Sequence, residues 1–370
     1  MKKPNIGGQA VLEGVMMRSP VTEKLAICVR RTDGTMALSE KPAPVAKSGP
    51  ASWPFLRGVV NFVRMLVLGM GTLTDSAQML GEEYEEEPSA FEKWLAKTLR
   101  IDTDQVVLGA AVVLALVLAI GLFFVLPNLA ASLISRWVKV PILVNLIEGA
   151  VRIGIFLLYL TLVTRMEDIR RTFGYHGAEH KVVNCFEADL PLTVENARKM
   201  TTRNPRCGTS FILFVMLISI LVFSLTGWNG GWLGRLLIRL ALLPVVASLS
   251  YELLMLLARY DNACIRVLRA PGLALQGLTT REPDDSMLEC ALAAFVAVLT
   301  PEQRAAQVPE DYRLPTEMEA EPENENPEGI VTEKPKANEP GEEPEETEAV
   351  EAVEAPLLPD DNDDSFPDKR

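Results

Sequence analysis

A long uncharged apolar run constrains the fold of this chain more than any other feature. Residues Val106 to Leu126 carry no charged side chain. A helix needs about 20 such residues to cross the roughly 30 Å hydrocarbon core of a bilayer. The run therefore predicts a membrane-spanning helix. Three further apolar stretches predict additional spans, at Ile142–Val163, Ser210–Thr226 and Leu236–Leu257.

The segment from residue 53 to residue 80 is predicted to be an amphipathic helix. Arg57, Asn61 and Arg64 fall on one side of it, and apolar side chains fall on the other. This pattern fits a helix that lies in the membrane interface better than one that crosses the bilayer. A crossing helix is the alternative, and it would place the N-terminus outside.

Basic residues predict the orientation in the membrane. Residues 164–209 carry eight Arg or Lys, residues 259–281 carry four, and residues 227–234 carry none. The positive-inside rule then predicts a multi-pass protein of the plasma membrane with both termini in the cytoplasm. The five cysteines would face the same reducing compartment, so we expect no disulfides.

The two ends of the chain differ from its apolar body. The Asp33-Gly34 step between two apolar runs predicts a β-hairpin. Residues 315–370 hold 20 acidic and 4 basic residues, and such a segment buries too little apolar surface to fold. The sequence thus predicts a mainly α, polytopic membrane protein of about four spans. Its parts are an N-terminal segment with a small β-hairpin (1–52), a helical membrane domain (53–300) and a disordered acidic tail (301–370).

A last helix is predicted just before the tail. Ser286, with Glu289 three residues later, forms the sequence pattern of a capping box. Apolar residues recur at helical spacing from Met287 to Leu299. We therefore expect a helix that starts at Ser286 and buries one face.

Both histidines of the chain lie in the sequence YHGAEHK, residues 175–181. On a helix, His176 and His180 project from one face, where two imidazoles can bind one metal ion. Glu179 can bind the metal or activate a metal-bound water, as in the inverted His-x-x-Glu-His zinc-protease pattern. Gly177 disfavours a helix by about 1 kcal/mol relative to Ala. The simpler alternative is a helix beside the membrane whose histidines contact lipid phosphates or carboxylates.

Nearby thiols can complete a ligand set. Cys207, in NPRCGTSF, lies at the start of the third predicted span, and Cys185 and Asn184 lie within two turns of the histidines. A catalytic zinc keeps three protein ligands and an open position, whereas a structural zinc has four. His176, His180 and Cys207 correspond to the first case, and the addition of Cys185 gives the second. The sequence leaves both open.

Ionisable residues inside the predicted spans form a second group of candidates. Glu148 and Glu252 cost free energy in hydrocarbon unless they face the interior of the helix bundle. Either can supply a metal ligand or a substrate contact, and we place Glu252 with Cys207 among the ligands. An ion pair with Arg152 or Arg239 is the alternative.

The N-terminal sequence GGQAVLEGVMMR forms a third candidate, at residues 7–18. Its glycines permit backbone geometries closed to other residues, and Gln9, Glu13 and Arg18 can line a polar pocket. It is not a phosphate-binding loop, because no Gly-Lys-Ser/Thr follows. The alternative is a tight turn with a methionine-rich packing face.

Five motifs in one order resemble the YqhQ-like family of bacterial integral membrane proteins: IGGQAVLEGVMMRSP, YHGAEHKVVNCFE, NPRCGTSF, SYELLMLLAR and PGLALQGLTTREPDD. The resemblance covers residues 4–300. That family has an unknown function and is sometimes labelled a metal-dependent enzyme. The resemblance implies a multi-span membrane protein with a metal site. The functional positions that it implies are Glu13, His176, Glu179, His180, Asn184, Cys207, Glu252 and the Arg281-Glu282-Pro283 turn. Cys185 lies where we expect the family to vary.

Together these features predict a divalent-metal enzyme, with zinc as the cofactor and a hydrolase as the reaction class. Its substrate, a lipid head group or a peptide, would lie at the cytoplasmic membrane face. A non-catalytic transporter or scaffold with a structural metal is the alternative. The expected partner is the lipid bilayer, with no nucleic acid. A homo-oligomer and a basic partner for the acidic tail stay open. We assign Glu179 and Glu13 as catalytic residues, and the metal ligands as His176, His180, Cys207 and Glu252.

Overall fold

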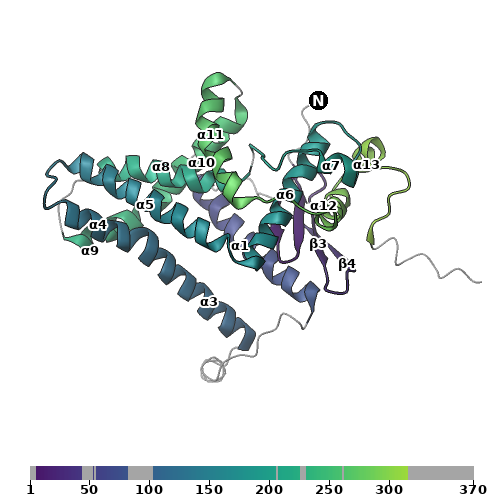
Figure 1. Cartoon of the computed structure of the whole chain (residues 1–370), viewed down its shortest axis with the longest axis horizontal. Helices are drawn as coiled ribbons and strands as arrows, with labels where there is room; N and C mark the ends of the chain where they lie inside the picture. The colour runs from purple at the N-terminus through teal and green to yellow at the C-terminus, as the bar shows by residue number, and fades with distance from the viewer. Residues whose placement is uncertain are drawn as a thin grey trace, which may run out of the picture. The chain divides into compact units, whose positions relative to one another are not determined.

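The computed structural model describes residues 6–43, 53, 56–81, 103–205, 207–225, 231–260 and 262–315, all within one compact unit. Helices dominate, and a four-stranded antiparallel sheet lies near the N-terminus (Figure 1). The predicted disordered tail lies outside the described residues, except for residues 301–315.

The sheet is larger than the sequence predicted. The expected hairpin at Asp33-Gly34 is confirmed, and Gly34 takes a left-handed φ of 87°. The Gly- and Met-rich segment before it forms a second hairpin, which turns at Leu12-Glu13 with a φ of 46° at Glu13. This hairpin escaped prediction because its glycines weaken the strand pattern. The strands pair in chain order: β1 (Gly7–Val11), β2 (Gly14–Ser19), β3 (Lys24–Arg30) and β4 (Met36–Pro42).

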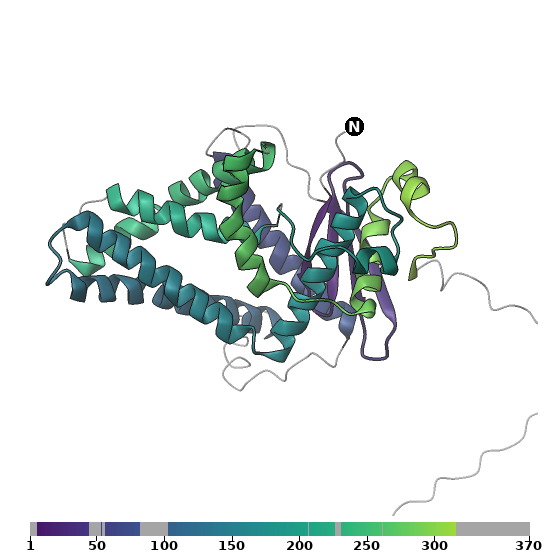
Figure 2. The same ribbon diagram turned by 45° about the horizontal axis from the view of Figure 1, so that its top comes forward.

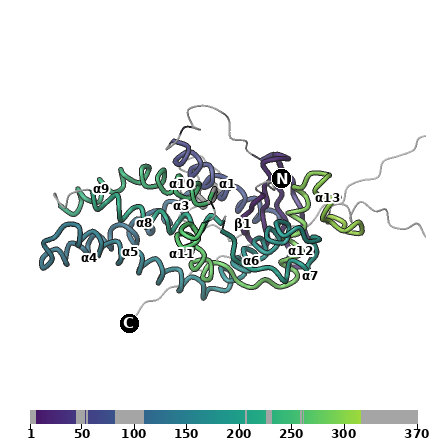
Figure 3. The backbone as a smooth tube through the Cα atoms, turned by 90° about the horizontal axis from the view of Figure 1, so that it is seen from above, coloured from purple at the N-terminus to yellow at the C-terminus, as the bar shows by residue number. Residues whose placement is uncertain are grey.

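Both faces of the sheet are covered. Alternate strand residues such as Val15 and Met17 pack against helices α6 (Glu167–Glu187) and α12 (Asp285–Ala297). The intervening residues, such as Met16 and Ile27, pack toward the end of α1 (Leu56–Leu80). Figure 3 shows α6 and α12 side by side next to β1. The period of two along the strands thus produces three layers.

The folded part continues beyond residue 300, where the sequence placed its end. Helix α13 (Pro301–Gln307) docks on the core, where the Leu192 N–H donates to the carbonyl of Gln307 at 2.7 Å. Leu314 is buried in the hydrophobic cluster that the sheet forms with α6 and α12. That cluster also contains Ile6, so the predicted boundary at residue 52 does not separate a core. Helix α7 (Val194–Arg198) packs beside α6 and α12.

The start of α12 differs from the predicted capping box. The cap is Asp284, whose carboxylate accepts from the Met287 N–H at 2.9 Å. Ser286 donates to that same carboxylate at 2.6 Å, and Glu289 pairs with Arg30 at 2.7 Å. An ionised Asp is as good an N-cap as Ser, so the N-cap, and with it the start of the helix, lies two residues earlier than predicted.

The first predicted span is confirmed as a helix, but it is longer. Helix α3 (Thr103–Ile120) continues through a π-helix, η3 (Gly121–Val125), into α4 (Leu126–Ile134). The π turn precedes Pro127, which has no N–H to donate to the carbonyl of Phe123. Arg152 supplies the missing donor, since its Nε donates to the Phe123 carbonyl at 2.9 Å.

Within the described residues, three helices are long and apolar enough to cross a membrane: Leu56–Leu80, Gly109–Ile134 and Pro141–Val163 (α5). The prediction for residues 142–163 is confirmed as a helix. Helix α1 passes this test too, although the sequence favoured an interfacial position. The span predicted at 236–257 is instead two helices bent by 45°, α9 (Trp232–Ala241) and α10 (Leu243–Arg259), which would make a fourth crossing if they act as one.

Two other helices complete the bundle seen in Figure 2. Helix α8 (Thr209–Leu225) has 17 residues and is therefore about 26 Å long, shorter than the hydrocarbon core. Helix α11 (Ala263–Thr279) was not predicted, and Pro271 lies inside it. It packs along α8, and a β-carbon at Gly272 would lie 2.7 Å from the Ser210 hydroxyl.

A buried charge network ties α5, α8 and α9 together. Glu148 is 2% exposed and pairs with Arg152 at 3.0 Å and with Arg239. Ser219 of α8 accepts from Arg152 at 3.1 Å, and Asn145 accepts from Arg239 at 3.2 Å. The ion-pair alternative therefore holds for Glu148, which is not a metal ligand.

Removal of the Glu148 carboxylate should destabilise the bundle strongly, because two buried guanidinium groups would lose their counter-charge. We expect Glu148→Ala to lower the free energy of unfolding by about 3–5 kcal/mol. Glu195→Ala removes a 75% exposed partner of Lys199 and should change it by less than about 0.5 kcal/mol. Thermal unfolding in detergent measures both, and equal midpoints would contradict the assignment.

Gly177 is required where α6 touches the segment before α12. A β-carbon there would lie 2.0 Å from the carbonyl oxygen of Arg281. We expect Gly177→Ala to destabilise by about 1–3 kcal/mol through overpacking. Gly154 of α5 has open space around it, so Gly154→Ala should be neutral or stabilising by up to about 1 kcal/mol. The same unfolding measurement distinguishes the two.

Candidate metal centre

Helix α6 is polar in sequence, but its second half is buried in the fold. Glu167 and Asp168 in its first turn favour helix formation through the helix dipole. Further along, Glu179, His180 and Lys181 are all 5% exposed or less. Buried polar groups cost free energy unless each has a partner. Lys181 has two, since Nζ donates to the Arg198 carbonyl at 2.8 Å and pairs with Glu282.

The two imidazoles converge, as the sequence predicted. His176 and His180 lie one turn apart with ring centroids 4.4 Å from each other. The Nδ1 of His176 is 2.8 Å from the Thr279 carbonyl, and the Nδ1 of His180 is 2.5 Å from the Thr202 carbonyl. A carbonyl oxygen can only accept, so both Nδ1 atoms carry the proton. Neither Nε2 therefore carries a proton, and each has a lone pair that can bind a metal, in the arrangement typical of metal-ligating histidines.

Cys207 joins the histidines from the other side. Its Sγ lies 3.2 Å from the Nε2 of His176. The N–H of Thr209, at the start of α8, points at the same sulfur from 3.4 Å, and such a donor stabilises negative charge on a thiolate. The ligand atoms of His176, His180 and Cys207 all lie within 4.8 Å of one another.

This spacing suits a zinc ion. Zinc bonds of about 2.1 Å to nitrogen and 2.3 Å to sulfur, at a tetrahedral angle, place two ligand atoms roughly 3.6 Å apart. The separation of 3.2 Å between His176 and Cys207 is close to that value. The Nε2 of His180 is buried and has no hydrogen-bond partner. Most buried polar atoms have a partner, so this orphaned atom is the strongest sign of a ligand at this site.

Glu179 borders the same space. Its Oε1 accepts from the Gly8 N–H of β1 at 3.2 Å, and its Oε2 lies 3.5 Å from the Nε2 of His180. Burial by itself lowers the pKa of His180, but the adjacent Cys207 sulfur and the Glu179 charge outweigh it and raise that pKa above its ordinary value. The surroundings of His180 are therefore negative and favour a cation.

Glu252 and Glu13 lie elsewhere. Both carboxylate oxygens of Glu252 accept from Arg57 of α1, at 2.7 and 2.5 Å. The structure thus does not bring this expected ligand to the histidines, because the Arg57 guanidinium pairs with both of its carboxylate oxygens. Glu13 accepts from Arg171 at 2.8 Å on the first half of α6, away from the metal cluster.

Cys185 is not part of the cluster either. It is buried in the core beside α12, and its sulfur lies 3.5 Å from the Pro191 carbonyl. Side chains at i and i+5 on a helix point in different directions, which separates Cys185 from His180. A closed site with Cys185 as the fourth ligand is therefore wrong for this geometry.

Two amides hold the loop that carries Cys207, and the sequence analysis did not assign them this role. Gln276 of α11 both accepts from the Asn204 N–H at 2.9 Å and donates to its carbonyl at 2.7 Å. Asn184 donates to the carbonyls of Thr201 and Arg203, at 2.8 and 3.1 Å. They fix the Thr202 carbonyl that orients His180. Its position near the histidines and the family resemblance both pointed to Asn184, but as a residue of the site itself, and no sequence pattern marked Gln276.

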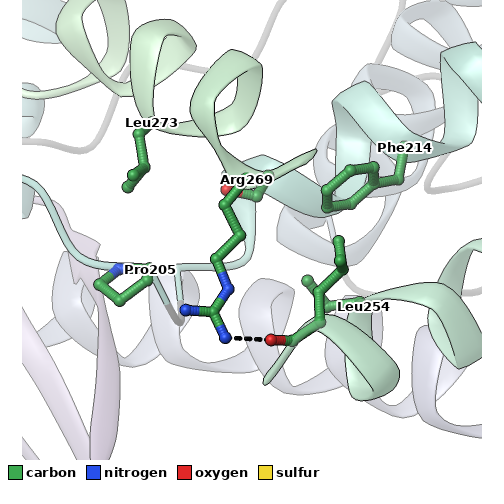
Figure 4. A pocket seen from close by; sticks show the side chains of 7 residues that line it. Pro205, Phe214, Leu254, Arg269 and Leu273 are labelled. Carbon is green, nitrogen blue, oxygen red and sulfur yellow. Dashed lines mark hydrogen bonds between the residues drawn. The ribbon is translucent and has the colours of Figure 1, made fainter. Parts of the chain in front are cut away.

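A small pocket lies beyond this loop, between α8, α10 and α11 (Figure 4). Its volume is about 10 Å³, which is about the space that one water needs. Arg269 reaches across it and donates to the carbonyls of Leu257 and Tyr260. This pocket is a packing feature and is too small for a substrate.

Comparison with known proteins agrees with the motif order. The family described as a protein of unknown function, DUF1385, matches residues 53–301. The chain is 34% identical over 311 residues to the uncharacterized protein YqhQ of Bacillus subtilis (strain 168). The alignment covers 82% of this chain and 95% of that protein. No solved structure matches. The family match spans α6, the Cys207 loop and α12, and the chain therefore belongs to the YqhQ-like DUF1385 family.

Proposed function

We propose that this protein is a metal-dependent enzyme whose centre is formed by His176, His180 and Cys207. The observation that carries the proposal is the buried Nε2 of His180, which has no hydrogen-bond partner while its Nδ1 is held by a carbonyl. A bound cation would satisfy this atom. Two imidazoles and one thiolate are ligands that zinc prefers.

The reaction class that we propose is hydrolysis. A zinc ion held by His176, His180 and Cys207 would supply a site at which water is activated as a nucleophile. Glu179 lies within 3.5 Å of a ligand atom and can take the proton of such a water. The Gly8 N–H holds the other carboxylate oxygen and keeps Glu179 oriented for that role. Glu13 is a remaining candidate for substrate contact, through Arg171.

The site of action that we propose is the cytoplasmic face of the plasma membrane. Helix α6 follows α5, one of the helices apolar enough to cross a bilayer, after a break of three residues. The basic residues of the segment 164–209 support a cytoplasmic position by the positive-inside rule. Both termini would then lie in the cytoplasm, and the substrate would be presented by the membrane surface.

One observation favours a non-catalytic alternative, a transporter or scaffold with a structural metal. Glu179 is 5% exposed and lies close enough to become a fourth ligand. Four protein ligands close a zinc site and leave no position for water. The centre would then hold α6, the Cys207 loop and α11 together without turnover.

Metal content tests the centre itself. We expect the full chain, purified in detergent, to hold about one zinc ion, and His176→Ala with His180→Ala to hold almost none, because two of three ligands are lost. Cys207→Ser should also lose the thiolate-to-metal charge-transfer band of the cobalt-substituted protein. Cys185→Ser is the matched control and should keep both. Equal metal content in wild type and the double histidine variant would refute the centre.

Glu179→Gln separates the enzyme from the structural alternative. As a general base, Glu179 should contribute about 10²–10⁴-fold to turnover, so the variant should keep its zinc and lose hydrolysis of ester and phosphoester probes. The readouts are zinc content and the rate on that probe panel. Loss of zinc in Glu179→Gln would identify the carboxylate as a fourth ligand and favour the structural role.

A further inference from the structure

A second polar region lies on the opposite side of α6 from the metal centre. It is a groove of about 750 Å³ at the start of α6 and the approach to α12. That volume lies within the range of about 300–1,000 Å³ typical of ligand sites. The lining residues include four arginines: Arg165, Arg170, Arg171 and Arg281.

One acidic group in this groove is neutralised by a cation, and a second caps a helix. Glu282 pairs with Lys181, and Asp284 caps α12 through the Met287 N–H. Arg171 is likewise engaged, with Glu13. Glu167 is the remaining carboxylate of the lining.

Three guanidinium groups are left over. Within the part of the chain that the structure describes, the side chains of Arg165, Arg170 and Arg281 have no hydrogen-bond or ion-pair partner, and all three residues are exposed. The carboxylates of Glu167 and Asp284 oppose them, since Asp284 keeps its charge while it caps α12. The groove therefore carries an excess of positive charge in a concave space, which concentrates anions.

The start of α6 adds to this field. Helix α6 begins in the groove at Glu167, and its N-cap Met166 provides no side-chain hydrogen bond to the first turn. The N-terminus of a helix carries about half a positive charge and unpaired N–H groups. At α12 the Asp284 carboxylate already occupies this position. The arginines and the start of α6 thus favour the same kind of ligand.

We propose that this groove binds a phosphate ester, through Arg165, Arg170 and Arg281. The planar guanidinium group matches the oxygens of phosphate in pairs. The groove is large enough for the ester's organic part as well as its phosphate. Arg165 follows the end of α5 by two residues, at the level where a crossing helix would meet lipid head groups. An anionic lipid head group and a soluble phosphomonoester share the required chemistry.

The proposed site is independent of the metal centre, although one segment serves both. The carbonyl of Thr279 orients His176, and Arg281 lines the groove two residues later. The groove side of α6 carries Arg170, Arg171 and Gly174. Substitution of the groove arginines therefore removes no metal ligand, and failure of one proposal leaves the other standing.

Calorimetric titration of the full chain in detergent tests the site. The probes are dioctanoylphosphatidic acid, sn-glycerol 3-phosphate and the zwitterionic dioctanoylphosphatidylcholine. We expect saturable binding of the phosphatidic acid, at least about tenfold weaker in Arg165→Gln with Arg170→Gln, because two charge-assisted contacts are lost. Comparable binding of glycerol 3-phosphate would identify a soluble ester as the natural ligand, and its absence would identify a lipid.

The matched control removes the same charge from the other end of α5. Arg136→Gln with Lys139→Gln changes two exposed cations just before α5 and should leave binding unchanged. Zinc content and the unfolding midpoint of both double variants should equal those of the wild type. The proposal is overturned if wild type shows no saturable binding, or if both double variants bind as tightly as wild type.

Discussion

The close contact between Gly177 and the carbonyl of Arg281 determines how the rest of the site is arranged. Because Gly177 has no side chain, the segment before α12 can lie directly against α6. The Arg281 N–H donates to the Phe173 carbonyl at 2.8 Å from the same segment. This approach brings the Thr279 carbonyl to His176 on one side and Arg281 to the groove on the other. A larger residue would push both apart.

Burial of a polar helix is the second condition, and it explains why the partners around α6 are so specific. A helix surrounded by β1, α7 and α12 would ordinarily be apolar. Here Lys181, Glu179 and His180 are buried. Glu179 accepts from the Gly8 N–H of β1, whereas Lys181 donates to a carbonyl of α7 and His180 donates to a carbonyl of the Cys207 loop. Because desolvation is costly, these elements must close together or not at all. The amides of Gln276 and Asn184 belong to the same requirement, since they shape the loop that faces His180.

The apolar helices also bury charged side chains, and there too each charge needs a partner. Glu148, Arg152 and Arg239 form a network inside the bundle, and Arg152 also satisfies the carbonyl that Pro127 leaves free. Buried polar groups cost free energy unless each has a partner. These buried charges therefore hold η3, α5, α8 and α9 in one arrangement, whereas Glu252 and Arg57 hold α1 against α10.

The sequence alone was sufficient for features that depend on local pattern. Apolar length marked the helices at 106–126 and 142–163, Asp33-Gly34 marked a hairpin, and the spacing of His176 and His180 placed both rings on one helical face. Cys207 was a candidate because it lies at the start of the third predicted span, on the same predicted side as the histidines, and because zinc prefers thiolate ligands. These predictions rest on periodicity and composition, which the chain carries without its fold.

The tertiary structure decided which partner each polar side chain contacts. Glu252 could have met the histidines, but Arg57 of a distant helix takes both of its oxygens. Cys185 is near His180 in sequence, yet its position on the helix turns it into the core. The glycine-rich N-terminus became two strands only because α6, α12 and α1 cover its faces. Contacts between residues far apart in the sequence select one partner among several of similar chemistry. The local sequence pattern contains no information about which of these contacts forms.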